Sequence, residues 1–466
     1  MKKVTPKHYF MVGIGGIGMQ ALADVLLGMG NRITGSDIQD FPGRKRLESK
    51  GAKVIIGEQI AENVPTDINE LIYTSAAARP DTVHLEIEQA KKMGRTAWKR
   101  SEFIGELMKN KIGIAVSGTH GKTTVSTLIT LILQEAGMDP TALIGAEVKS
   151  LEGCGILGRS EYWVIEACEY DRAFLDMRPK IAVLTNIDAD HLDYYQDINE
   201  IKQAFAQFLQ LVPTDGLVVA CGDDPNILEI LPQAKSKVIK FGFSTSSEIG
   251  NNLVARDIIY QDGKMKFAVD GIQTWLKFPG KHLVMDALAA IAVAKHLKVS
   301  DAVIKMVLEN KFQGADRRFE IVGNIGGVAF VDDYGHHPTE IQATLAAARD
   351  YFGGRKIRVV FQAHQYSRTR LLLNEFAQSF GDADEVLIAP ILAVRDSEED
   401  IQAIDNNRLA EAIDKISHNA RAYSDFQEIS DYLSAALQPG EVVISLGAGK
   451  NSDWIKEFVS AYSQTD

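Results

Sequence analysis

The residues of this chain with the most definite chemistry form the stretch S-G-T-H-G-K-T-T at positions 117–124. Its two glycines leave room for backbone N–H groups to close around phosphate oxygens. The lysine supplies a cation for the β- and γ-phosphates of a nucleotide, and the threonine after it offers a hydroxyl to Mg²⁺. The stretch therefore predicts a nucleotide-binding loop, formed by Gly118, Thr119, His120, Gly121, Lys122, Thr123 and Thr124.

The residues on either side supply the elements that such a loop requires. The apolar run 112–116 predicts a buried parallel strand, and the run 125–133 predicts the helix that follows. The general pattern G-x-x-x-x-G-K-[ST] would place its first glycine at position 116, where this chain has Val116. The alternative is a glycine-rich turn with a surface lysine, but the ordered succession of strand, loop, Lys-Thr-Thr and apolar helix favours the phosphate loop.

Two polar side chains follow other apolar strands of the same region. Glu166 comes just after the predicted strand 162–165, and His191 lies in a polar cluster after the predicted strand 181–184. A carboxylate at a strand end beside a phosphate loop can hold Mg²⁺ directly or through water, and a histidine there can ligate a second divalent ion. We predict Thr123, Glu166 and His191 as metal ligands. The alternatives are a glutamate in a surface loop and a structural histidine.

A second glycine-rich loop lies near the N-terminus, in a predicted strand–loop–helix–strand unit over residues 8–37. The pattern G-x-G-x-x-G runs from Gly13 to Gly18, and Asp37 follows about 20 residues later. This pattern predicts a pyrophosphate at the start of the helix. A dinucleotide is the default ligand, and a UDP-sugar fits the same geometry.

The last third of the chain carries further groups suited to anions. Arg318 could clamp a phosphate through paired N–H bonds, and Asp333 follows an apolar strand where it could accept from a ribose hydroxyl. His364 and Arg368 follow another predicted strand, at a position suited to an anionic substrate. The alternative is a solvated loop and a helix start near Pro338.

Strand and helix patterns alternate along the 466 residues, which predicts an α/β fold of about three domains. A five-strand parallel sheet is expected to end near residue 105, and a third α/β segment begins after Gly314. Between them, residues 252–278 are strand-rich with Asp-Gly turn signals, and an Ala-rich helix is expected over 286–298. The predicted domains are 1–108, 109–314 and 315–466.

Composition excludes several classes of protein. The hydrophobic content of 45% and charged content of 24% are typical of globular domains, and no apolar run is long enough to span a bilayer. A net charge of −12 argues against a general nucleic-acid binder. The N-terminus lacks a signal-peptide pattern, and the three cysteines are too few for a disulfide framework, so we expect buried thiols and a cytoplasmic location.

Together these motifs resemble those of the Mur ligases, ATP-dependent amide-forming enzymes of peptidoglycan synthesis. The resemblance covers nearly the full length. It implies a Rossmann-like domain for a UDP-linked substrate, a central P-loop ATPase-like domain, and a C-terminal Rossmann-like domain that closes over both. The matching motifs, in family order, are G-I-G-G-I-G-M, S-G-T-H-G-K-T-T, E-A-C-E-Y-D, N-I-D-A-D-H-L-D-Y-Y, R-R-F-E, D-D-Y-G-H-H-P-T-E and Q-A-H-Q-Y-S-R-T-R.

The resemblance implies ATP and Mg²⁺ as cofactors, and UDP-N-acetylmuramate and L-alanine as substrates. The muramate carboxylate would attack the γ-phosphate to give an acyl phosphate, which the amine of L-alanine would then attack. The implied catalytic residues are Lys122, Glu166, His191 and Arg318, with Asp286 and Asp333 as nucleotide contacts. The implied substrate-binding residues are Gly15, Gly16, Ile17, Gly18, Ser36, Asp37, Ser75, His336, His364 and Arg368.

This chain departs from the family pattern at several positions. The family motif H-N-x-x-N, which we expect just before the Ala-rich helix, reads H-L-V-M-D here, with Leu283 and Asp286 in place of adenine-contacting asparagines. Ala363 and Gln365 replace Pro and Arg, and the C-terminal G-A-G-D-I reads G-A-G-K-N. Some sister ligases carry a modified lysine on the helix after the histidine cluster. Lys202 is a poor match for it, so we predict no carbamylated lysine.

Three other functions stay open at this point. A recycling ligase would join UDP-N-acetylmuramate to a preformed tripeptide. A NAD-dependent dehydrogenase would use the glycine loop at Gly13 but leave the second phosphate loop unexplained. A non-catalytic relative is conceivable because of Leu283 and Asp286. The sequence does not fix the oligomeric state.

Overall fold

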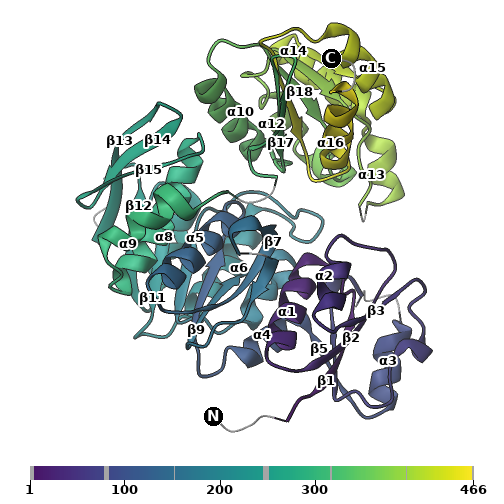
Figure 1. Cartoon of the computed structure of the whole chain (residues 1–466), viewed down its shortest axis with the longest axis vertical. Helices are drawn as coiled ribbons and strands as arrows, with labels where there is room; N and C mark the ends of the chain where they lie inside the picture. Colours follow the sequence, from purple (N-terminus) through teal and green to yellow (C-terminus); the bar gives the residue numbers. More distant parts are fainter. Residues whose placement is uncertain are drawn as a thin grey trace. The chain divides into compact units, whose positions relative to one another are not determined.

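The computed structural model describes residues 5–77, 83–151, 153–244, 251–314, 317–394 and 396–463. The chain, whose helices and strands are labelled in Figure 1, divides into two compact units. The first unit comprises residues 1–187, 199–255 and 286–315, and the second comprises 188–198, 256–285 and 316–466. Each unit is built from parallel sheets covered by helices, which confirms the predicted α/β class, whereas the predicted domain boundaries at 108/109 and 314/315 stay predictions.

The N-terminal part of the first unit is a five-stranded parallel sheet in the order β3-β2-β1-β4-β5, as predicted. Strand β1 is buried along its whole length, which explains its unbroken apolar character. The elements are β1 (His8–Val12), α1 (Ile17–Gly28), β2 (Arg32–Asp37), α2 (Arg44–Ser49), β3 (Lys53–Ile56), η1 (Ala61–Asn63), β4 (Glu70–Tyr73), η2 (Ser75–Ala77), α3 (Leu85–Lys92), β5 (Thr96–Lys99) and α4 (Arg100–Leu107).

The central sheet places the phosphate-loop strand β6 between β10 and β9, in the order β13-β12-β11-β10-β6-β9-β7-β8. Only β8 is antiparallel to its neighbour among these described strands. The elements are β6 (Ile112–Ser117), α5 (Lys122–Glu135), β7 (Thr141–Val148), η3 (Lys149–Leu151), β8 (Gly153–Ile156), β9 (Tyr162–Glu166), η4 (Tyr170–Asp176), β10 (Ile181–Leu184), α6 (Ile198–Gln210), β11 (Leu217–Cys221), α7 (Pro225–Ile230), η5 (Leu231–Gln233) and β12 (Lys237–Gly242).

The two sheets of the first unit are joined by close packing of α1 against β8. A Cβ at Gly155 would lie 2.1 Å from the carbonyl oxygen of Ala21, so only glycine allows this approach. Beside it, buried Asp24 pairs with Arg46 and, at 2.8 Å, with Lys50. Helix α1, whose first turn carries the N-terminal glycine loop, is therefore held at a defined distance from the central sheet.

The predicted hairpins follow β12. They are formed by β13 (Asn251–Gln261), β14 (Lys264–Val269) and β15 (Ile272–Leu276), with β14 and β15 antiparallel. Both Asp-Gly turns have positive φ at both residues, +55° and +71° at Asp262-Gly263 and +46° and +80° at Asp270-Gly271. These values are typical of type I′ turns, for which Asp-Gly is a preferred pair.

The Ala-rich helix begins earlier than predicted. Helix α8 spans Lys281–His296, so Leu283 and Asp286 lie within its first two turns and not in a preceding segment. The prediction placed the start at 286 because the apolar periodicity becomes regular only there. It is followed by α9 (Asp301–Met306) and the π-helical turn η6 (Val307–Lys311).

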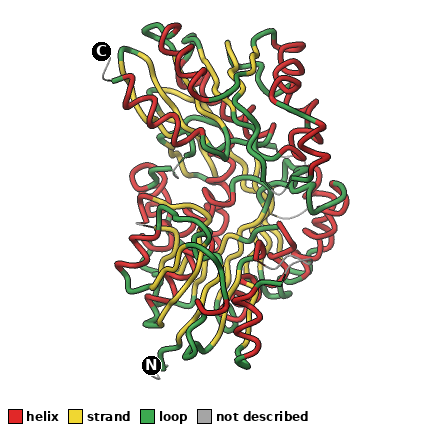
Figure 2. The backbone as a smooth tube through the Cα atoms, turned by 90° about the vertical axis from the view of Figure 1, so that its right-hand side faces the viewer, coloured by secondary structure: helices red, strands yellow, loops and turns green. Residues whose placement is uncertain are grey.

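The C-terminal sheet has the order β16-β17-β21-β18-β19-β20 and is parallel except for β16. Figure 2 shows helices on both sides of its strands. Successive strand residues enter different cores: Val359 and Phe361 belong to one, Val360 to the other. The elements are β16 (Glu320–Ile325), β17 (Val328–Asp333), α10 (Pro338–Phe352), β18 (Ile357–Phe361), α11 (Tyr366–Leu371), α12 (Leu373–Ala377), β19 (Glu385–Ile388), α13 (Glu398–Ala403), α14 (Asn406–Ser417), β20 (Ala420–Ala422), α15 (Phe426–Ala436), β21 (Val442–Leu446) and α16 (Asn451–Tyr462).

The structure also bears on the expectations of buried cysteine thiols and of a chain without a membrane-spanning helix. Cys154 and Cys221 are buried as predicted, whereas Cys168 is partly exposed. No helix in the described part of the chain is both long and apolar enough to cross a membrane. The residue pattern also predicts a helix over 82–93, and its first residue, Thr82, lies outside the described residues.

Candidate functional site

The phosphate loop connects β6 to α5, as the sequence predicted. Gly118 has φ +136° and Gly121 has φ +82°, backbone conformations that favour glycine. A Cβ at Gly118 would lie 2.0 Å from the hydroxyl oxygen of Thr185, so space as well as conformation requires glycine there. The loop's last residues, Lys122, Thr123 and the buried Thr124, form the first turn of α5, whose N-terminal N–H groups favour an anion.

Lys122 is paired with a carboxylate that the sequence analysis did not select. Its Nζ lies 3.1 and 3.0 Å from the two carboxylate oxygens of Glu169 and donates to the carbonyl oxygens of Gly118 and Thr119. Burial opposes the charge on Lys122, but the carboxylates of Glu169 and Glu166 outweigh it, so the pKa of Lys122 is raised. Glu169 therefore keeps the charged Lys122 side chain folded back onto the phosphate loop.

Glu166 lies beside the hydroxyl of Thr123. It is the last residue of β9 and pairs in register with Val116 of β6, which brings its carboxylate to the loop. Thr123 Oγ1 donates to both carboxylate oxygens at 3.1 and 3.2 Å, and the backbone N–H of Gly145 donates at 2.6 Å. A hydroxyl and a carboxylate converging on one point are hard oxygen donors, which fit Mg²⁺.

The strand on the other side of β6 braces the loop through His120. Asn186 Oδ1 accepts from the backbone N–H of His120 at 2.8 Å, and its Nδ2 donates to the His120 carbonyl at 3.1 Å. Thr185 Oγ1 donates to the same carbonyl at 2.5 Å. The backbone N–H and the carbonyl of His120 are therefore both held by the side chains of the two residues that follow β10.

Asp286 lies against the phosphate loop. A Cβ at Gly121 would come within 2.4 Å of Asp286 Oδ1, and the Asp286 side chain is buried. The carboxylate of Asp286 therefore lies next to the loop backbone. The predicted contact of Asp286 with a nucleotide base stays a prediction.

The N-terminal glycine loop has the geometry of a pyrophosphate cradle. Gly13 has φ +75°, Gly16 directly precedes the first residue of α1, Ile17, and the N–H of Gly15 donates to Asp37 at 2.8 Å. The two remaining predicted substrate-binding residues of this region are Ser36 and Ser75. Ser75 opens the 3-10 turn after β4, whereas Ser36 is 1% exposed and its hydroxyl donates to Glu86 at 2.6 Å.

Arg100, which the sequence analysis missed, stands at the same loop. It begins α4, and a Cβ at Gly18 would lie 2.8 Å from its Nη1. Burial lowers the pKa of Arg100, while Cys168 and Glu166 lie close enough to oppose that effect. In the described part of the chain its guanidinium has no hydrogen-bonding or ion-pair partner. A guanidinium left unpaired at a helix N-terminus is suited to an anionic ligand. No sequence signal distinguishes Arg100 from other surface cations.

In the second unit, Arg318 and Asp333 lie near each other but are already engaged. Arg318 Nη1 is 3.5 Å from Glu340, a residue the sequence analysis did not select, and its guanidinium lies 5.3 Å from the ring centre of Tyr334. Asp333 accepts from the N–H groups of Phe319 and Gly335, both at 2.8 Å. Burial raises the pKa of Asp333. Their predicted roles toward nucleotide stay predictions.

The predicted substrate-binding residues of the second unit form one cluster. The rings of His336 and His364 are 6.0 Å apart, and Arg368 Nη1 donates to the carbonyl of His364 at 3.0 Å. Burial lowers the pKa of His336 to about 4, so its imidazole is neutral near pH 7. Gln365 has φ +83° and is 2% exposed.

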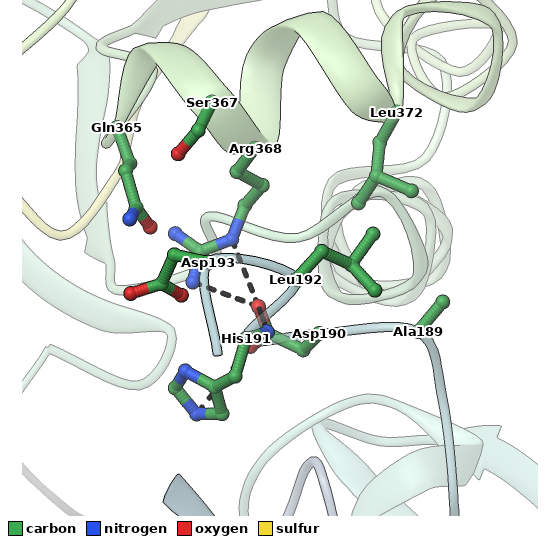
Figure 3. Close-up of a pocket in the computed structure, with 9 residues that line it drawn as sticks. All are labelled: Ala189, Asp190, His191, Leu192, Asp193, Gln365, Ser367, Arg368 and Leu372. Atoms are coloured by element: carbon green, nitrogen blue, oxygen red, sulfur yellow. Dashed lines mark hydrogen bonds and ion pairs between the residues drawn. The ribbon is translucent and has the colours of Figure 1, made fainter. Parts of the chain in front are cut away.

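The segment that carries His191 also belongs to the second unit and lines a small pocket with Arg368 (Figure 3). Figure 3 shows Arg368 reaching from α11 toward Asp190, the residue before His191. Glu166 and Thr123 belong to the first unit and His191 to the second. Their predicted joint role as metal ligands stays a prediction.

The turn 447–451 after β21, which reads G-A-G-K-N, contacts the side chain of Gln362, the residue directly after β18. The N–H of Lys450 donates to Gln362 Oε1 at 2.8 Å, and a Cβ at Gly449 would lie 2.2 Å from that oxygen. The Gln362 side chain therefore fills the space beside this turn.

Lys202, the lysine compared above with the modified lysine of sister ligases, lies on α6 and pairs with Glu229 at 2.8 Å.

Comparisons with known proteins cover most of the chain. Residues 8–112 match the family described as Mur ligase family, catalytic domain, residues 116–294 match the Mur ligase middle domain, and residues 317–449 match the Mur ligase, glutamate ligase domain. The three matched segments follow one another in the order that the motifs predicted.

Similar full-length proteins are known from several bacteria. A protein of Caldanaerobacter subterraneus named UDP-N-acetylmuramate–L-alanine ligase is 41% identical over 450 residues, 95% of each chain. A protein of Clostridium kluyveri with the same name is 40% identical over 96% of each chain. The solved structure of UDP-N-acetylmuramate-alanine ligase MurC from Thermotoga maritima has a TM-score of 0.80 and 25% identity, covering 99% of this chain and 100% of that one. A murein peptide ligase from Psychrobacter arcticus shares the fold, with a TM-score of 0.70 and 22% identity over 98% of this chain and 99% of that one.

Proposed function

The chain belongs to the Mur ligase family, and we propose that it is an ATP-dependent ligase that joins L-alanine to UDP-N-acetylmuramate in peptidoglycan synthesis. One observation carries the proposal. A phosphate loop with a charged lysine and a threonine–carboxylate pair lies in a chain about 40% identical, along nearly its whole length, to ligases of that name.

The phosphate loop supplies what phosphoryl transfer requires, which is positioning and neutralisation of charge. Backbone N–H groups of the loop and of the first turn of α5 hold the phosphates of ATP. Lys122 exchanges its contact with Glu169 for the β- and γ-phosphates. Because Thr185 and Asn186 fix His120 on the opposite side, the loop itself needs little rearrangement when nucleotide binds.

Mg²⁺ is the metal that suits this site. The residues that would hold it are Thr123, through its hydroxyl, and Glu166, through its carboxylate, with His191 as the further ligand predicted from sequence. When bound, Mg²⁺ would neutralise the negative charge of the phosphates. Gly145 orients the Glu166 carboxylate by donating its N–H.

The reaction then proceeds in two displacements. An oxygen of the muramate carboxylate attacks the γ-phosphorus, the bond to the β-phosphate oxygen breaks, and ADP leaves. The amine of L-alanine attacks the acyl carbon, loses a proton, and expels inorganic phosphate. The N-terminal glycine loop, with Gly15 and Gly18, would hold the diphosphate of the UDP substrate, and Arg100 would add a cation there. We place this reaction in the cytoplasm.

The proposal is tested by phosphate release and product formation with the purified protein. We expect release that depends on ATP, UDP-N-acetylmuramate and L-alanine together, with glycine, L-serine and a tripeptide offered as competing acceptors. Preference for the tripeptide would assign the chain to the recycling reaction. Tight NADH binding without binding of the UDP-sugar would point to a dehydrogenase, and absence of any release would point to a non-catalytic relative.

A further inference from the structure

The segment 188–192, which contains His191, makes several contacts with the rest of the second unit. Asp188 accepts from the hydroxyl of Thr339 at 2.6 Å. The carbonyl of Ala189 accepts from His337 Nε2 at 3.2 Å. Leu192 packs against the apolar core of the C-terminal sheet. A side-chain bond, a backbone bond and an apolar contact therefore link this segment to the rest of the second unit.

The strongest attachment is the ion pair between Arg368 and Asp190. Arg368 Nε and Nη2 both donate to Asp190 Oδ1, at 2.9 and 2.8 Å, and both side chains are less than 10% exposed. The same carboxylate oxygen accepts from the backbone N–H of His191 at 2.7 Å. Arg368 thus fixes, through one oxygen, the backbone at which the His191 side chain begins. Charge-assisted bonds of this kind are about twice as strong as neutral ones.

The residue immediately before the segment is held by the other unit. The N–H of Ile187 donates to Asp224 at 3.0 Å, and its carbonyl accepts from Asn226 at 2.8 Å. Asp224 also accepts from Ile227 and so caps α7. Ile187 belongs to the first unit, and the segment assigned to the second unit begins at residue 188.

We propose that Arg368 is a positioning residue for His191, whose backbone it fixes through the Arg368–Asp190 ion pair. The role in metal binding rests on the proposed function, whereas the attachment does not. The sequence had assigned Arg368 to the substrate. Because its Nε and Nη2 are used by Asp190 and its Nη1 by His364, its paired N–H groups are directed at the protein.

Hydrogen exchange of the ligand-free protein tests the attachment. The variants are Arg368→Ala, Arg368→Lys and Asp190→Asn, and the matched control is Arg370→Ala. Arg370 lies on the same helix, but its side chain is 42% exposed and pairs with Asp400. We expect the protected amides of His191, Tyr194 and Tyr195 to exchange about tenfold faster or more in Arg368→Ala, less so in Arg368→Lys, and unchanged in the control.

Steady-state kinetics test the consequence for the site. We expect Arg368→Ala and Asp190→Asn to raise the Mg²⁺ concentration at half-maximal rate by a similar factor, about tenfold, while KM for L-alanine and for UDP-N-acetylmuramate stays within twofold. The double variant should be no worse than the single ones, because both remove the same pair.

Two results would overturn the proposal. One is unchanged exchange at residues 191–195 in Arg368→Ala, which would show that the pair does not hold the segment. The other is a rise in KM for either substrate with an unchanged Mg²⁺ requirement, which would return Arg368 to substrate binding. Since the exchange experiment uses no substrate, failure of the proposed function would appear separately, as a wild-type protein that does not ligate L-alanine.

Discussion

Replacing Glu169 with glutamine tests how the phosphate loop is kept ready for nucleotide. In the structure both Glu169 oxygens lie within 3.1 Å of Lys122 Nζ, and the two side chains are only 3% and 14% exposed. Glutamine keeps the size of the side chain and one acceptor oxygen but removes the negative charge. Lys122 would then remain charged without its main counterion in the absence of nucleotide.

The magnitude follows from the geometry. Two unit charges 3.0 Å apart attract by about 5 kcal/mol at an effective dielectric constant of 20, and loss of hydration cancels much of this. Hydrogen bonds to charged groups contribute about 1.5–3 kcal/mol net. We therefore expect Glu169→Gln to lower the free energy of unfolding of the nucleotide-free protein by about 2 kcal/mol. Because Glu169 competes with phosphate for Lys122, we expect ATP to bind about tenfold more tightly, since each 1.4 kcal/mol is a factor of ten.

Titration calorimetry with ATP and urea unfolding without nucleotide measure the two effects. Glu166→Gln is the matched control, because it is the same substitution three residues away on a carboxylate that faces Thr123. We expect it to weaken binding of the magnesium nucleotide. If Glu169→Gln weakens ATP binding as Glu166→Gln does, Glu169 helps to hold the nucleotide and the reasoning from competition is wrong.

Three further changes have definite expected outcomes. Lys122→Ala should lower the rate of ATP-dependent phosphate release by about 10²–10³-fold while binding of UDP-N-acetylmuramate, followed by calorimetry, is unchanged. Arg100→Ala should raise KM for UDP-N-acetylmuramate about tenfold, with Arg100→Lys intermediate and KM for ATP unchanged; equal KM values in variant and wild type would exclude the anion contact. Because burial lowers the pKa of His336 to about 4 from an unfolded value of about 6.5, its contribution to stability is complete above pH 6.5 and is lost as the pH falls from 6.5 to 4. Urea midpoints measured over this range should fall less steeply in His336→Gln than in the wild type, and parallel curves would contradict the assignment.

The elements of the fold were largely predictable because their patterns are local. The strand at 181–184 has the predicted bounds, and the Asp-Gly hairpin turns are where the residue pairs indicated. The start of α8 was missed because Lys281–Met285 lack the regular apolar spacing of the Ala-rich part. The strand–loop–helix arrangement around residues 117–124 was predicted correctly because glycine spacing, lysine and threonine all lie within eight residues.

The partners of the predicted site residues were not predictable. Glu169 is 47 positions from Lys122, and Asp190 is 178 positions from Arg368. Which of several nearby carboxylates would meet each cation depends on strand order and on the path of loops between strands. Arg100 has no motif of its own, and its position beside Gly18 follows only from the packing of α4 against the glycine loop.

The sequence by itself determined the family, the α/β class and the glycine loop between β6 and α5, because each depends on residues close together in the chain or on motifs in a fixed order. Only the tertiary structure decided that Lys122 pairs with Glu169, that Arg100 lies at the glycine loop without a hydrogen-bonding or ion-pair partner among the described residues, and that Arg368 pairs with Asp190. The physical reason is that an ion pair forms between side chains that the sheets bring within about 3 Å, and the distance along the chain does not specify that approach.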